Sequence, residues 1–558
     1  MAFDEAEQKE KIDLLHKREE EDLTHLLAQK YKLPYLNLLR AGIDLDALHI
    51  ISEEVSRNAG IAIIKAAGKK LQLAVKNPNI DKVKEAIDEL RRSGYEPQLF
   101  LVSVTSLNHA WSRYKEISAE SAVTSNVINI SKGDLADFRS KIKNTRDFAR
   151  IITQKITAGA TRRVTDLLDL ILAGAFELVV SDVHVEPAEK EVHMRVRLDG
   201  VLQDITTFGH EIHKMLLSRL KLVCELKLNV HERSQDGRFT IRADNVDVEV
   251  RVSILPSPYG ESIVMRILHP RAISATYEDL GMEAPLRELI EKELQKPNGM
   301  IITTGPTGSG KTTTLYAFIK KLNEPGIKII TIEDPIEYHI AGITQTQTNK
   351  DSGYTFETGL SAIVRQDPDI VLVGEMRNRE TAEIGMQASL TGHLVFSTLH
   401  TNNAPGTIPR LIDLGVPPNI IAPAINVAIA QRLVRVLCQS CKQKADLSKT
   451  ELDIITRLVS TLPPAYAYAQ ELLKKMGVFV AGTCELCNDT GYKGRIGLFE
   501  AFLIDDSMEE LILKNPSEAA VREAAVKRGM ATLQQDGAIK ILAGKTSFDE
   551  VNRMVGLV

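Results

Sequence analysis

Residues 300–313 read MIITTGPTGSGKTT and contain the pattern G-x-x-x-x-G-K-[ST]. The pattern follows a short β-prone run and precedes a segment with helical character, which is the strand-to-helix context of a phosphate-binding loop. Its glycines allow backbone N–H groups to converge on phosphates, while Lys311 supplies positive charge and the Thr312 hydroxyl is the expected magnesium ligand. We therefore predict an ATP-binding loop made of Gly305, Pro306, Thr307, Gly308, Ser309, Gly310, Lys311, Thr312 and Thr313.

Acidic residues follow two further apolar runs that are typical of buried parallel strands. The run 370–373 ends at Glu375, which is the predicted Walker B acid. The run 327–332 leads into three carboxylates that include Glu333 and Glu337, at the end of a strand where α/β sheets bind ligands. One of them is expected to polarise the attacking water. The alternative, that such residues cap helices and solvate loops, suits an isolated carboxylate better than clusters after two strands of one sheet.

Four of the five cysteines form two C-x2-C pairs, at Cys438, Cys441, Cys484 and Cys487. Two such pairs make a tetrahedral thiolate site without an open position, so we predict structural zinc. Iron–sulfur ligation is the alternative, because ligand identity alone does not exclude it. The metal is expected to close a protruding insert that is largely helical. The fifth cysteine, Cys224, is expected to be a small buried thiol.

The bulk composition is that of a large globular protein. Its 558 residues suggest three to five domains, at about 100 to 200 residues each. A net charge of −5 provides no global basic field for gripping nucleic acid. The acidic amino-terminal segment lacks the pattern of a signal peptide, and the weakly charged run 414–431 contains three prolines and is not expected to span a membrane. A protein of the reducing cytoplasm is expected.

Hydrophobic periodicity predicts several α/β modules. In the amino-terminal part, strands are expected at 61–64, 71–75 and 99–102, with an amphipathic helix at 81–90. Residues 118–160 have the polar, mixed-charge composition of a linker that becomes helical.

A second domain begins with an amphipathic helix that starts near Val164. Its strands have a period of two, as in 192–198 and 246–252. Arg251 alternates with the valines of the second strand, so it should point to solvent or to a ligand. From about Asp279 onward, short apolar strands alternate with helices, as in a mostly parallel α/β sheet.

With these residues in place, the chain resembles the secretion ATPase family (the general secretory pathway E type) that powers type II secretion and type IV pilus assembly. The resemblance covers about residues 160–558. It rests on an ordered series of segments: 181–187 (SDVHVEP), 195–200 (RVRLDG), 235–238 (QDGR), the phosphate-binding loop, an "Asp box" at 333–337, 365–369 (RQDPD) before Gly374 and Glu375, a "His box" at 391–402, 491–495 (GYKGR) and 532–537 (TLQQDG).

The resemblance implies a homohexamer in which the nucleotide lies between the P-loop domain and the preceding domain, whose Arg251 and Arg266 reach the phosphates. The alternative for these arginines is surface pairing with Asp247 or Glu261, which would contribute little.

The resemblance also implies roles for other residues of the site. Glu337 is implied as the general base, Glu375 as a support for metal and water, and His393 and His400 as sensors of the γ-phosphate. The alternative for the histidines is a structural role. Two departures from the family pattern concern local packing: Asn378 stands where family members commonly carry Asp, and residues 224–227 (CELK) replace a segment that usually contains glycine.

The implied fold class is α/β and multidomain, with a RecA-like P-loop ATPase core, a preceding α+β domain, a tetracysteine zinc insert and a small N-terminal α/β module. The corresponding boundaries are 1–117 for the N-terminal partner-docking module, 118–160 for the linker, 161–280 for the α+β domain, 281–435 for the core, 436–490 for the zinc insert and 491–558 for a C-terminal helical subdomain.

The implied function is that of a cytoplasmic ATPase, peripherally associated with the inner membrane, that uses ATP, Mg²⁺ and Zn²⁺. It would extrude a pilus or a secretion pseudopilus through an inner-membrane platform protein. The N-terminal module is expected to dock partners, with cyclic di-GMP binding as a second possibility. A pilus retraction motor and a nucleic-acid-translocating ATPase are the rival functions; the tetracysteine insert and the N-terminal extension argue against the first, and the net charge argues against the second and against any nucleic-acid partner.

Overall fold

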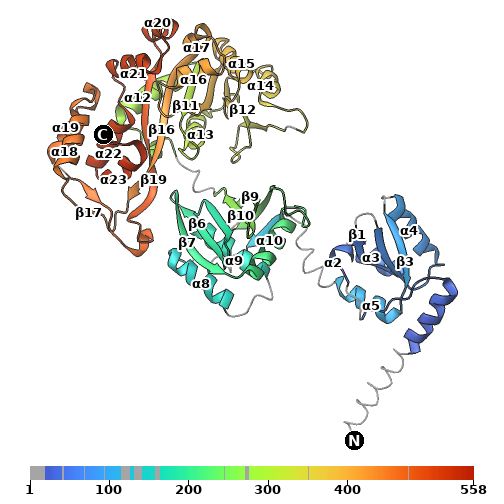
Figure 1. The fold of residues 1–558 in the computed structure, drawn as a ribbon. Coiled ribbons are helices and arrows are strands. Elements are labelled where there is room, and N and C mark those ends of the chain that lie inside the picture. Colours follow the sequence, from blue (N-terminus) through green and yellow to red (C-terminus); the bar gives the residue numbers. More distant parts are fainter. Residues whose placement is uncertain are drawn as a thin grey trace. The chain divides into compact units, whose positions relative to one another are not determined.

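The computed structural model of the chain describes residues 19–39, 43–48, 50–67, 70–92, 95–114, 126–130, 138, 141–157, 164–243, 246–269, 276–349, 351–475 and 477–557. The chain forms two compact units, Met1–Val127 and Ile128–Val558 (Figure 1). Among the helices of the described residues, none is long and apolar enough to cross a membrane.

The first unit contains a three-stranded sheet of β1 (Ile61–Ala67), β2 (Lys70–Val75) and β3 (Glu96–Leu101), in that order. Strands β2 and β3 are parallel, and parallel neighbours need a crossover, which the amphipathic helix α4 (Asp81–Arg92) provides. The three predicted strands and the predicted helix are confirmed. The first unit also contains a helical segment at residues 19–31 and the helices α2 (Leu45–Leu48), α3 (Glu53–Ala59) and α5 (Val104–Ser112).

Of the predicted linker, 118–160, the structure describes residues 126–130, 138 and 141–157. Its described part includes β4 (Val127–Ile130) and α8 (Thr145–Thr157), so the expected change to helix is confirmed.

A seven-stranded sheet follows, with the order β4-β8-β9-β10-β5-β6-β7. Every neighbouring pair from β8 to β7 is antiparallel, and the helices α9 and α10 pack against each other beside the sheet. The valines predicted to face the core on β6 and β9 are buried, except Val246 at the start of β9, which is exposed, and Arg251 lies on the opposite, polar face as predicted. The elements are α9 (Val164–Glu177), β5 (Asp182–Pro187), β6 (Val192–Leu198), β7 (Val201–Phe208), α10 (His210–Val223), β8 (Gln235–Ala243), β9 (Val246–Ser257) and β10 (Gly260–Ile267).

The second large sheet has the order β13-β12-β14-β15-β11-β16-β19. The first six strands are parallel and only β19 runs against its neighbour, which confirms the predicted mostly parallel α/β sheet. Its strands are β11 (Gly299–Thr304), β12 (Ile329–Glu333), β13 (Thr344–Gln347), β14 (Ile370–Val373), β15 (Leu394–Leu399), β16 (Ile425–Leu437) and β19 (Tyr492–Leu503).

Helices cover both faces of this sheet. Side chains of α12 (Ala284–Leu294) and α13 (Lys311–Leu322) share one apolar cluster with the strands, and those of α14 (Phe356–Val364), α15 (Arg379–Leu390), α16 (Thr407–Asp413) and α17 (Pro418–Ala424) share another. The central strands β11, β12, β14 and β15 are therefore buried throughout, as their continuous apolar sequences predict. A single 3₁₀ turn, η1 (Glu278–Leu280), precedes α12.

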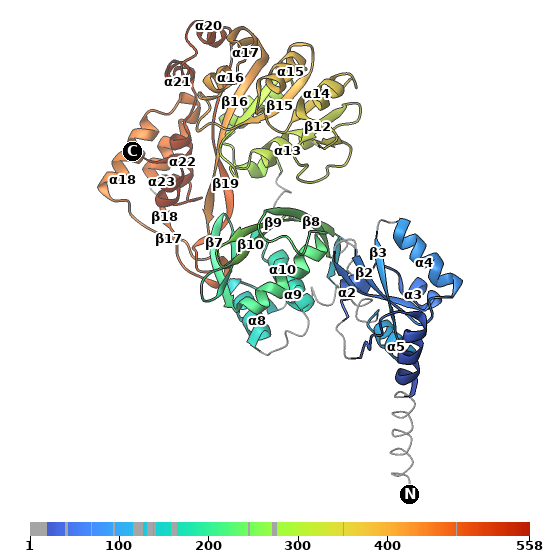
Figure 2. The same ribbon diagram turned by 45° about the vertical axis from the view of Figure 1, so that its right-hand side comes forward.

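Strands β16 and β19 form a long antiparallel ribbon that extends beyond the other strands (Figures 1 and 2). The segment between them holds β17 (Gln443–Lys444), α18 (Lys449–Ser460), η2 (Pro464–Tyr466), α19 (Tyr468–Lys475), β18 (Phe479–Val480) and η3 (Glu485–Cys487). The chain ends in α20 (Asp506–Lys514), α21 (Glu518–Lys527), α22 (Leu533–Leu542) and α23 (Phe548–Val555).

The insert between the cysteine pairs is helical as predicted, but the expectation that it protrudes is wrong. Ile455 and Val459 of α18 and Ala469 of α19 are buried in the same apolar cluster as α22. The apolar stripes of these amphipathic helices need a partner surface, and α22 provides it.

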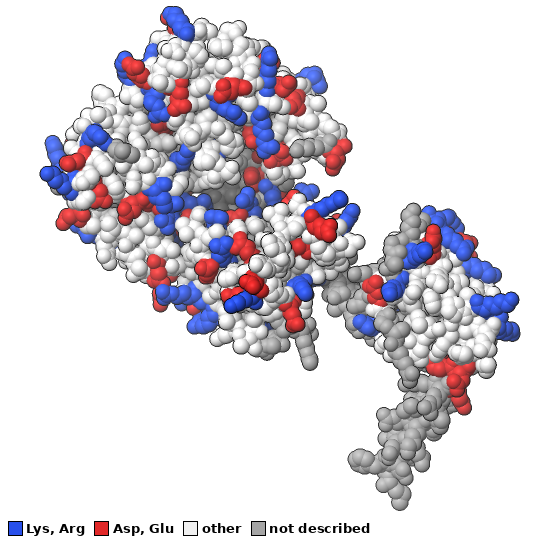
Figure 3. All heavy atoms as spheres, in the orientation of Figure 1, with Lys and Arg blue, Asp and Glu red and all other residues white. Residues whose placement is uncertain are grey.

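Charged side chains of both signs are interspersed over the face of the second unit that Figure 3 shows. This distribution agrees with the small net charge of −5.

Candidate nucleotide site and metal centre

The phosphate-binding loop follows β11, a buried strand in the interior of the parallel sheet. Gly305, Gly308 and Gly310 all have positive φ, at 151°, 79° and 89°. A Cβ at Gly305 would lie 2.6 Å from the Gln431 carbonyl oxygen, and one at Gly310 would lie 2.8 Å from Gln431 Nε2. The loop therefore requires glycine both for its backbone conformation and for its close contact with β16.

Lys311 is the first residue of α13, and its side chain is buried against the loop. Its Nζ donates hydrogen bonds to the carbonyl oxygens of Gly305 at 2.7 Å and Pro306 at 3.1 Å. Burial lowers the pKa of Lys311 to about 8, although the nearby Glu375 carboxylate acts in the opposite direction. A cation at the amino end of a helix, beside converging backbone N–H groups, is well suited to bind an anion.

The other loop residues differ in exposure. Pro306, Thr307 and Gly308 are exposed, Thr312 and Thr313 in the first turn of α13 are half-buried, and Ser309 is buried. Within the described part of the chain, the Ser309 hydroxyl has no hydrogen-bond partner. These positions make the hydroxyl groups of the first helical turn available to a ligand at the mouth of the loop.

Glu375 follows β14 and lies near the loop, because β15 alone separates β14 from β11. Arg377 Nη2 lies 2.5 Å from Glu375 Oε1, and His400 Nε2 lies 3.7 Å from Glu375 Oε2. Burial and the positive charge of Lys311 lower the pKa of His400, while Glu375 acts to raise it. The structure thus brings together Lys311, Glu375 and His400 at the carboxyl ends of three neighbouring strands.

His393 lies at the other end of β15. The first residues of β11 and β15, Gly299 and Leu394, pair with each other, and the phosphate-binding loop follows the last residue of β11. Six residues of β15, at about 3.3 Å each, separate His393 from His400 by roughly 20 Å. His393 Nδ1 instead donates to the Ala388 carbonyl oxygen at 3.0 Å. The structure therefore does not bring His393 together with Lys311, Glu375 and His400 at this loop.

Glu333 ends β12 with its side chain 3% exposed. Its carboxylate accepts hydrogen bonds from Tyr316, from Thr331 at 2.6 Å and from Gln345 at 3.3 Å. Burial raises the pKa of Glu333, although these hydrogen bonds oppose the effect. The hydrogen bonds that the buried Glu333 carboxylate accepts thus come from other side chains of the protein.

Glu337 is more exposed and lies in contact with the preceding domain. Arg251 donates to Glu337 Oε2 at 3.2 Å and to the Ile336 carbonyl oxygen at 2.7 Å, and it also contacts Glu249 at 3.0 Å. Arg266, directly opposite Arg251 on β10, pairs with Asp182 at 2.9 Å.

The surface partners considered for the two arginines are wrong. Asp247 pairs with Arg242, and Glu261 pairs with the buried Lys221 and with His231. The structure thus places Arg251 at the segment after β12, as the nucleotide hypothesis needs, and places Arg266 beside it.

Two residues near the loop were missed by sequence reasoning. Arg432 is 9% exposed on β16, donates to the Asn402 carbonyl oxygen at 3.1 Å, and is close enough to Lys311 to lower its pKa. Gln431 accepts from Thr314 at 2.8 Å and packs against Gly310. Both lie within an apolar strand more than 100 residues after the loop, so only the parallel pairing of β11 with β16 reveals them.

One of the two departures from the family pattern has a structural explanation. Asn378 is the N-cap of α15, where its side chain accepts from Thr381 N at 3.0 Å and donates to Glu357. Cys224 is buried as predicted, and burial raises the pKa of its thiol to about 12.

The four remaining cysteines converge as predicted, with all sulfur atoms within 4.8 Å of one another. The distances are 3.8 Å for Cys438–Cys484, 3.7 Å for Cys441–Cys487 and 3.6 Å for Cys484–Cys487. A tetrahedral zinc centre with Zn–S bonds of about 2.3 Å has sulfur atoms about 3.8 Å apart, so the four thiolates fit one zinc ion. A cluster of several irons would hold its thiolates farther apart.

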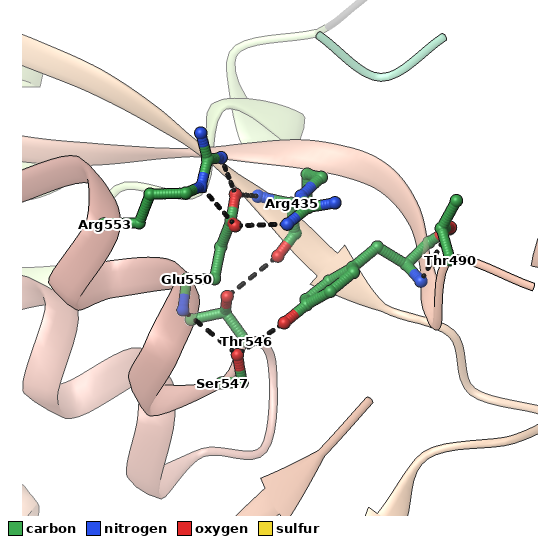
Figure 4. Close-up of polar contacts among 7 residues, drawn as sticks. Arg435, Thr490, Thr546, Ser547, Glu550 and Arg553 are labelled. Carbon is green, nitrogen blue, oxygen red and sulfur yellow. Dashed lines mark hydrogen bonds and ion pairs between the residues drawn. The ribbon is translucent and has the colours of Figure 1, made fainter. Parts of the chain in front are cut away.

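A network beside this centre fixes the last helix (Figure 4). Glu550, 1% exposed, receives hydrogen bonds from Arg435 Nη2 at 2.6 Å and from Arg553 Nη2 at 2.7 Å. Burial acts to raise the pKa of Glu550, but these charged donors outweigh it and lower the pKa to about 2. The Arg435 guanidinium also lies 4.1 Å from the ring centre of Tyr492, whose hydroxyl bonds to Ser547 at 2.6 Å.

A parallel sheet with a glycine-rich loop and lysine after an interior strand defines a P-loop nucleotide-binding protein with a RecA-like core. The solved structure of the Legionella pneumophila ATPase DotB shares this fold, with a TM-score of 0.51 at 20% identity, over 70% of this chain and 96% of that one. The profile of the type II/IV secretion system protein family matches residues 158–553, and the chain belongs to that family.

Two relatives illustrate the range of the family. The type IV pilus assembly ATPase PilB of Myxococcus xanthus is 35% identical over 539 residues, covering 96% of this chain and 91% of that protein. The type II secretion system protein E of Pseudomonas aeruginosa is 41% identical over 421 residues, covering 75% of this chain and 80% of that protein.

Proposed function

We propose that the protein is a Mg²⁺-dependent ATPase that drives type IV pilus assembly. The observation that carries the ATPase proposal is the convergence of Lys311, Glu375 and His400 beyond the carboxyl ends of β11, β14 and β15. Family membership supports ATP as the nucleotide, because the Myxococcus xanthus relative is named as an ATPase.

Each residue of the site has a task that its position supports. Lys311 and the backbone N–H groups of the loop neutralise the phosphates, and His400, between Lys311 and Glu375, contacts the γ-phosphate. The Thr312 hydroxyl and Glu375 would hold Mg²⁺, which when bound neutralises charge on the β- and γ-phosphates. Glu337 is the general base for water.

Glu333 is better suited to position than to react. Its oxygen atoms are taken up by Tyr316, Thr331 and Gln345, so it holds the end of β12 in place. Arg251 and Arg266 contact phosphates from the preceding domain, since a guanidinium forms paired hydrogen bonds with phosphate oxygens. Binding of nucleotide between the two domains would then close one on the other.

Pilus assembly is favoured over secretion by the extent of the similarity. The pilus assembly relative aligns with 96% of the chain, including the N-terminal unit, whereas the secretion relative aligns with 75%. Type II pseudopilus extrusion is the second candidate. In either case we propose a cytoplasmic homohexamer that acts on an inner-membrane platform protein, with the N-terminal module, residues 1–117, docking partners.

Zinc at the four cysteines has a structural role in this proposal. Four thiolates leave no coordination position for substrate, and the centre lies at the ends of β16 and β19 rather than at the phosphate-binding loop.

Lys311→Ala in the purified full-length protein tests the ATPase proposal. ATP turnover should be abolished, whereas Lys527→Ala, which removes an exposed lysine paired with Glu523, should leave turnover unchanged. Wild-type turnover in Lys311→Ala would refute the proposal.

A strain that lacks the protein tests the cellular role. It should lack surface pili and secrete its exoproteins normally. Excess pili would identify a retraction motor instead, and failed protein export with normal pili would identify the secretion role.

A further inference from the structure

A row of charged residues crosses five strands of the sheet that precedes the P-loop core. Cross-strand pairing puts Arg238 opposite Arg251, Arg251 opposite Arg266, Arg266 opposite Asp182, and Asp182 opposite Arg197. Directly paired residues point to the same face of a sheet. Four arginines and one aspartate therefore form a single line on the polar face.

The negative charges near this row are unevenly placed. Asp182 lies 2.9 Å from Arg266 and 3.4 Å from Arg197, and Arg251 contacts Glu249 and Glu337. Arg238 is exposed, and the described residues include no ion-pair partner for it. The end of the row at Arg238 thus carries excess positive charge.

This arrangement costs stability in the protein alone. Like charges directly opposite each other on neighbouring strands repel. Here three arginines stand opposite one another on three adjacent strands, and the Cα atoms of paired residues are about 5 Å apart. Local arrangements that lower stability without an evident structural gain are expected at functional sites. An anion that bridges the guanidinium groups would relieve the repulsion.

We propose that Arg238 is a third arginine, beside Arg251 and Arg266, that contacts the phosphates of the nucleoside triphosphate. The inference rests on the proposed ATPase function and adds a residue to its substrate site. Arg251, at the centre of the row, already reaches the segment after β12 that contains Glu337. Three fork-shaped donors in a line of about 10 Å suit an extended polyphosphate better than a single phosphate group.

Arg242 provides a matched control. It lies on the same strand and the same face, four residues or about 13 Å from Arg238, but pairs with Asp247 through two hydrogen bonds of 2.7 and 2.9 Å. A general effect of removing surface charge would therefore appear equally in Arg238→Ala and Arg242→Ala.

The experiment compares full-length wild type, Arg238→Ala, Arg238→Lys and Arg242→Ala. The dissociation constant of a fluorescent, non-hydrolysable ATP analogue and the KM for ATP should both rise at least tenfold in Arg238→Ala. Arg238→Lys should recover part of the loss, because it restores the charge without the fork. Arg242→Ala should stay within twofold of wild type, and inorganic tripolyphosphate should compete less well in Arg238→Ala only.

Thermal melting separates substrate contact from a structural role. Without nucleotide, Arg238→Ala should melt at the wild-type temperature or above, since it removes repulsion, and nucleotide should stabilise it less than wild type. A lower melting temperature without nucleotide, or affinities equal to those of Arg242→Ala, would overturn the inference. If Lys311→Ala abolishes turnover while Arg238→Ala matches wild type, the ATPase proposal stands and the inference alone fails; if Lys311→Ala keeps its turnover, the ATPase proposal itself fails.

Discussion

The buried carboxylate of Glu550 allows a quantitative prediction about the C-terminal helix. Its pKa is lowered from 4.5 to about 2 by the donors of Arg435 and Arg553, which outweigh the opposing effect of burial. This lowering of the pKa corresponds to about 3 kcal/mol of stabilisation at pH 7. Because the folded-state pKa is depressed, this stabilisation is complete above the unfolded-state pKa and is lost as the pH falls from about 5 to 2.

Glu550→Gln removes the charge and keeps the shape. Amide hydrogen exchange in α23 should become roughly 100-fold faster at pH 7, as expected for a loss of about 3 kcal/mol in the free energy of local opening. The difference from wild type should shrink to about 1 kcal/mol at pH 3, where the carboxyl group is protonated in the unfolded state.

Glu523→Gln is the control for Glu550→Gln. Its carboxylate pairs with Lys527 on the surface, with both side chains about 70% exposed, so hydrogen exchange in α21 should stay close to that of the wild type. Unchanged exchange in α23 of Glu550→Gln, or a difference from wild type that is as large at pH 3 as at pH 7, would refute the electrostatic reasoning.

Three further predictions concern the loop, the metal and the core. Burial lowers the pKa of Lys311 to about 8, so nucleotide binding at pH 8.5 should be accompanied by proton uptake, which is measured as a calorimetric binding enthalpy that depends on the buffer. Proton uptake should disappear at pH 6.5, and it should disappear in Lys311→Arg at either pH. Equal proton uptake by the wild type at both pH values would contradict this prediction. Elemental analysis should find one zinc per chain. Cys484→Ser should lose the zinc and the hydrogen-exchange protection of residues 436–490, while its nucleotide affinity stays within twofold of wild type. Visible absorption by an iron–sulfur cluster would disprove the assignment. Lys540→Met should destabilise the C-terminal helices by about 3–5 kcal/mol in hydrogen exchange, because it leaves the buried Asp536 carboxylate without its partner at 2.6 Å. The double variant with Asp536→Asn should recover part of that loss, and a double variant that recovers none would contradict this explanation.

Most of the fold could be predicted from the sequence where local pattern and tertiary environment agree. The strand β14 has the predicted bounds 370–373, and α4 and α9 lie where amphipathic periodicity places them. The surroundings of the cysteine insert could not be predicted in this way. The sequence of an amphipathic helix shows that the helix needs a partner surface, but it does not show which surface that is. The partner of α18 is α22, which lies more than 70 residues later in the chain.

The predicted site was partly assembled by the fold and partly divided by it. Neighbouring positions in a motif are not neighbours in space when a strand lies between them: His393 and His400 belong to one "His box" but lie at opposite ends of β15. Alternation on β9 was sufficient to predict the direction of Arg251. Its contact with Glu337 depends on the position of a whole domain, which no local pattern specifies.

The loop after β15 shows what the motif view omits. The Thr401 hydroxyl forms a hydrogen bond of 2.6 Å with the hydroxyl of Thr304, the last residue of the P-loop strand. The Asn402 carbonyl oxygen accepts a hydrogen bond from Arg432. One residue further on, Asn403 accepts from Gly406 N at 2.8 Å and donates to Glu518 of α21, also at 2.8 Å.

The buried Glu500 completes this connection. It accepts from Ala404 N at 2.8 Å and from Leu533 N of α22 at 3.2 Å. The segment 401–404 is therefore bonded on one side to the strand that presents the phosphate-binding loop and on the other to two C-terminal helices. Because a buried carboxylate without these backbone donors would be costly, the loop and the helices cannot separate at Glu500 without a large loss of stability. His400, at the start of this segment, thus lies at the end of a continuous bonded path from the nucleotide site to the C-terminal subdomain.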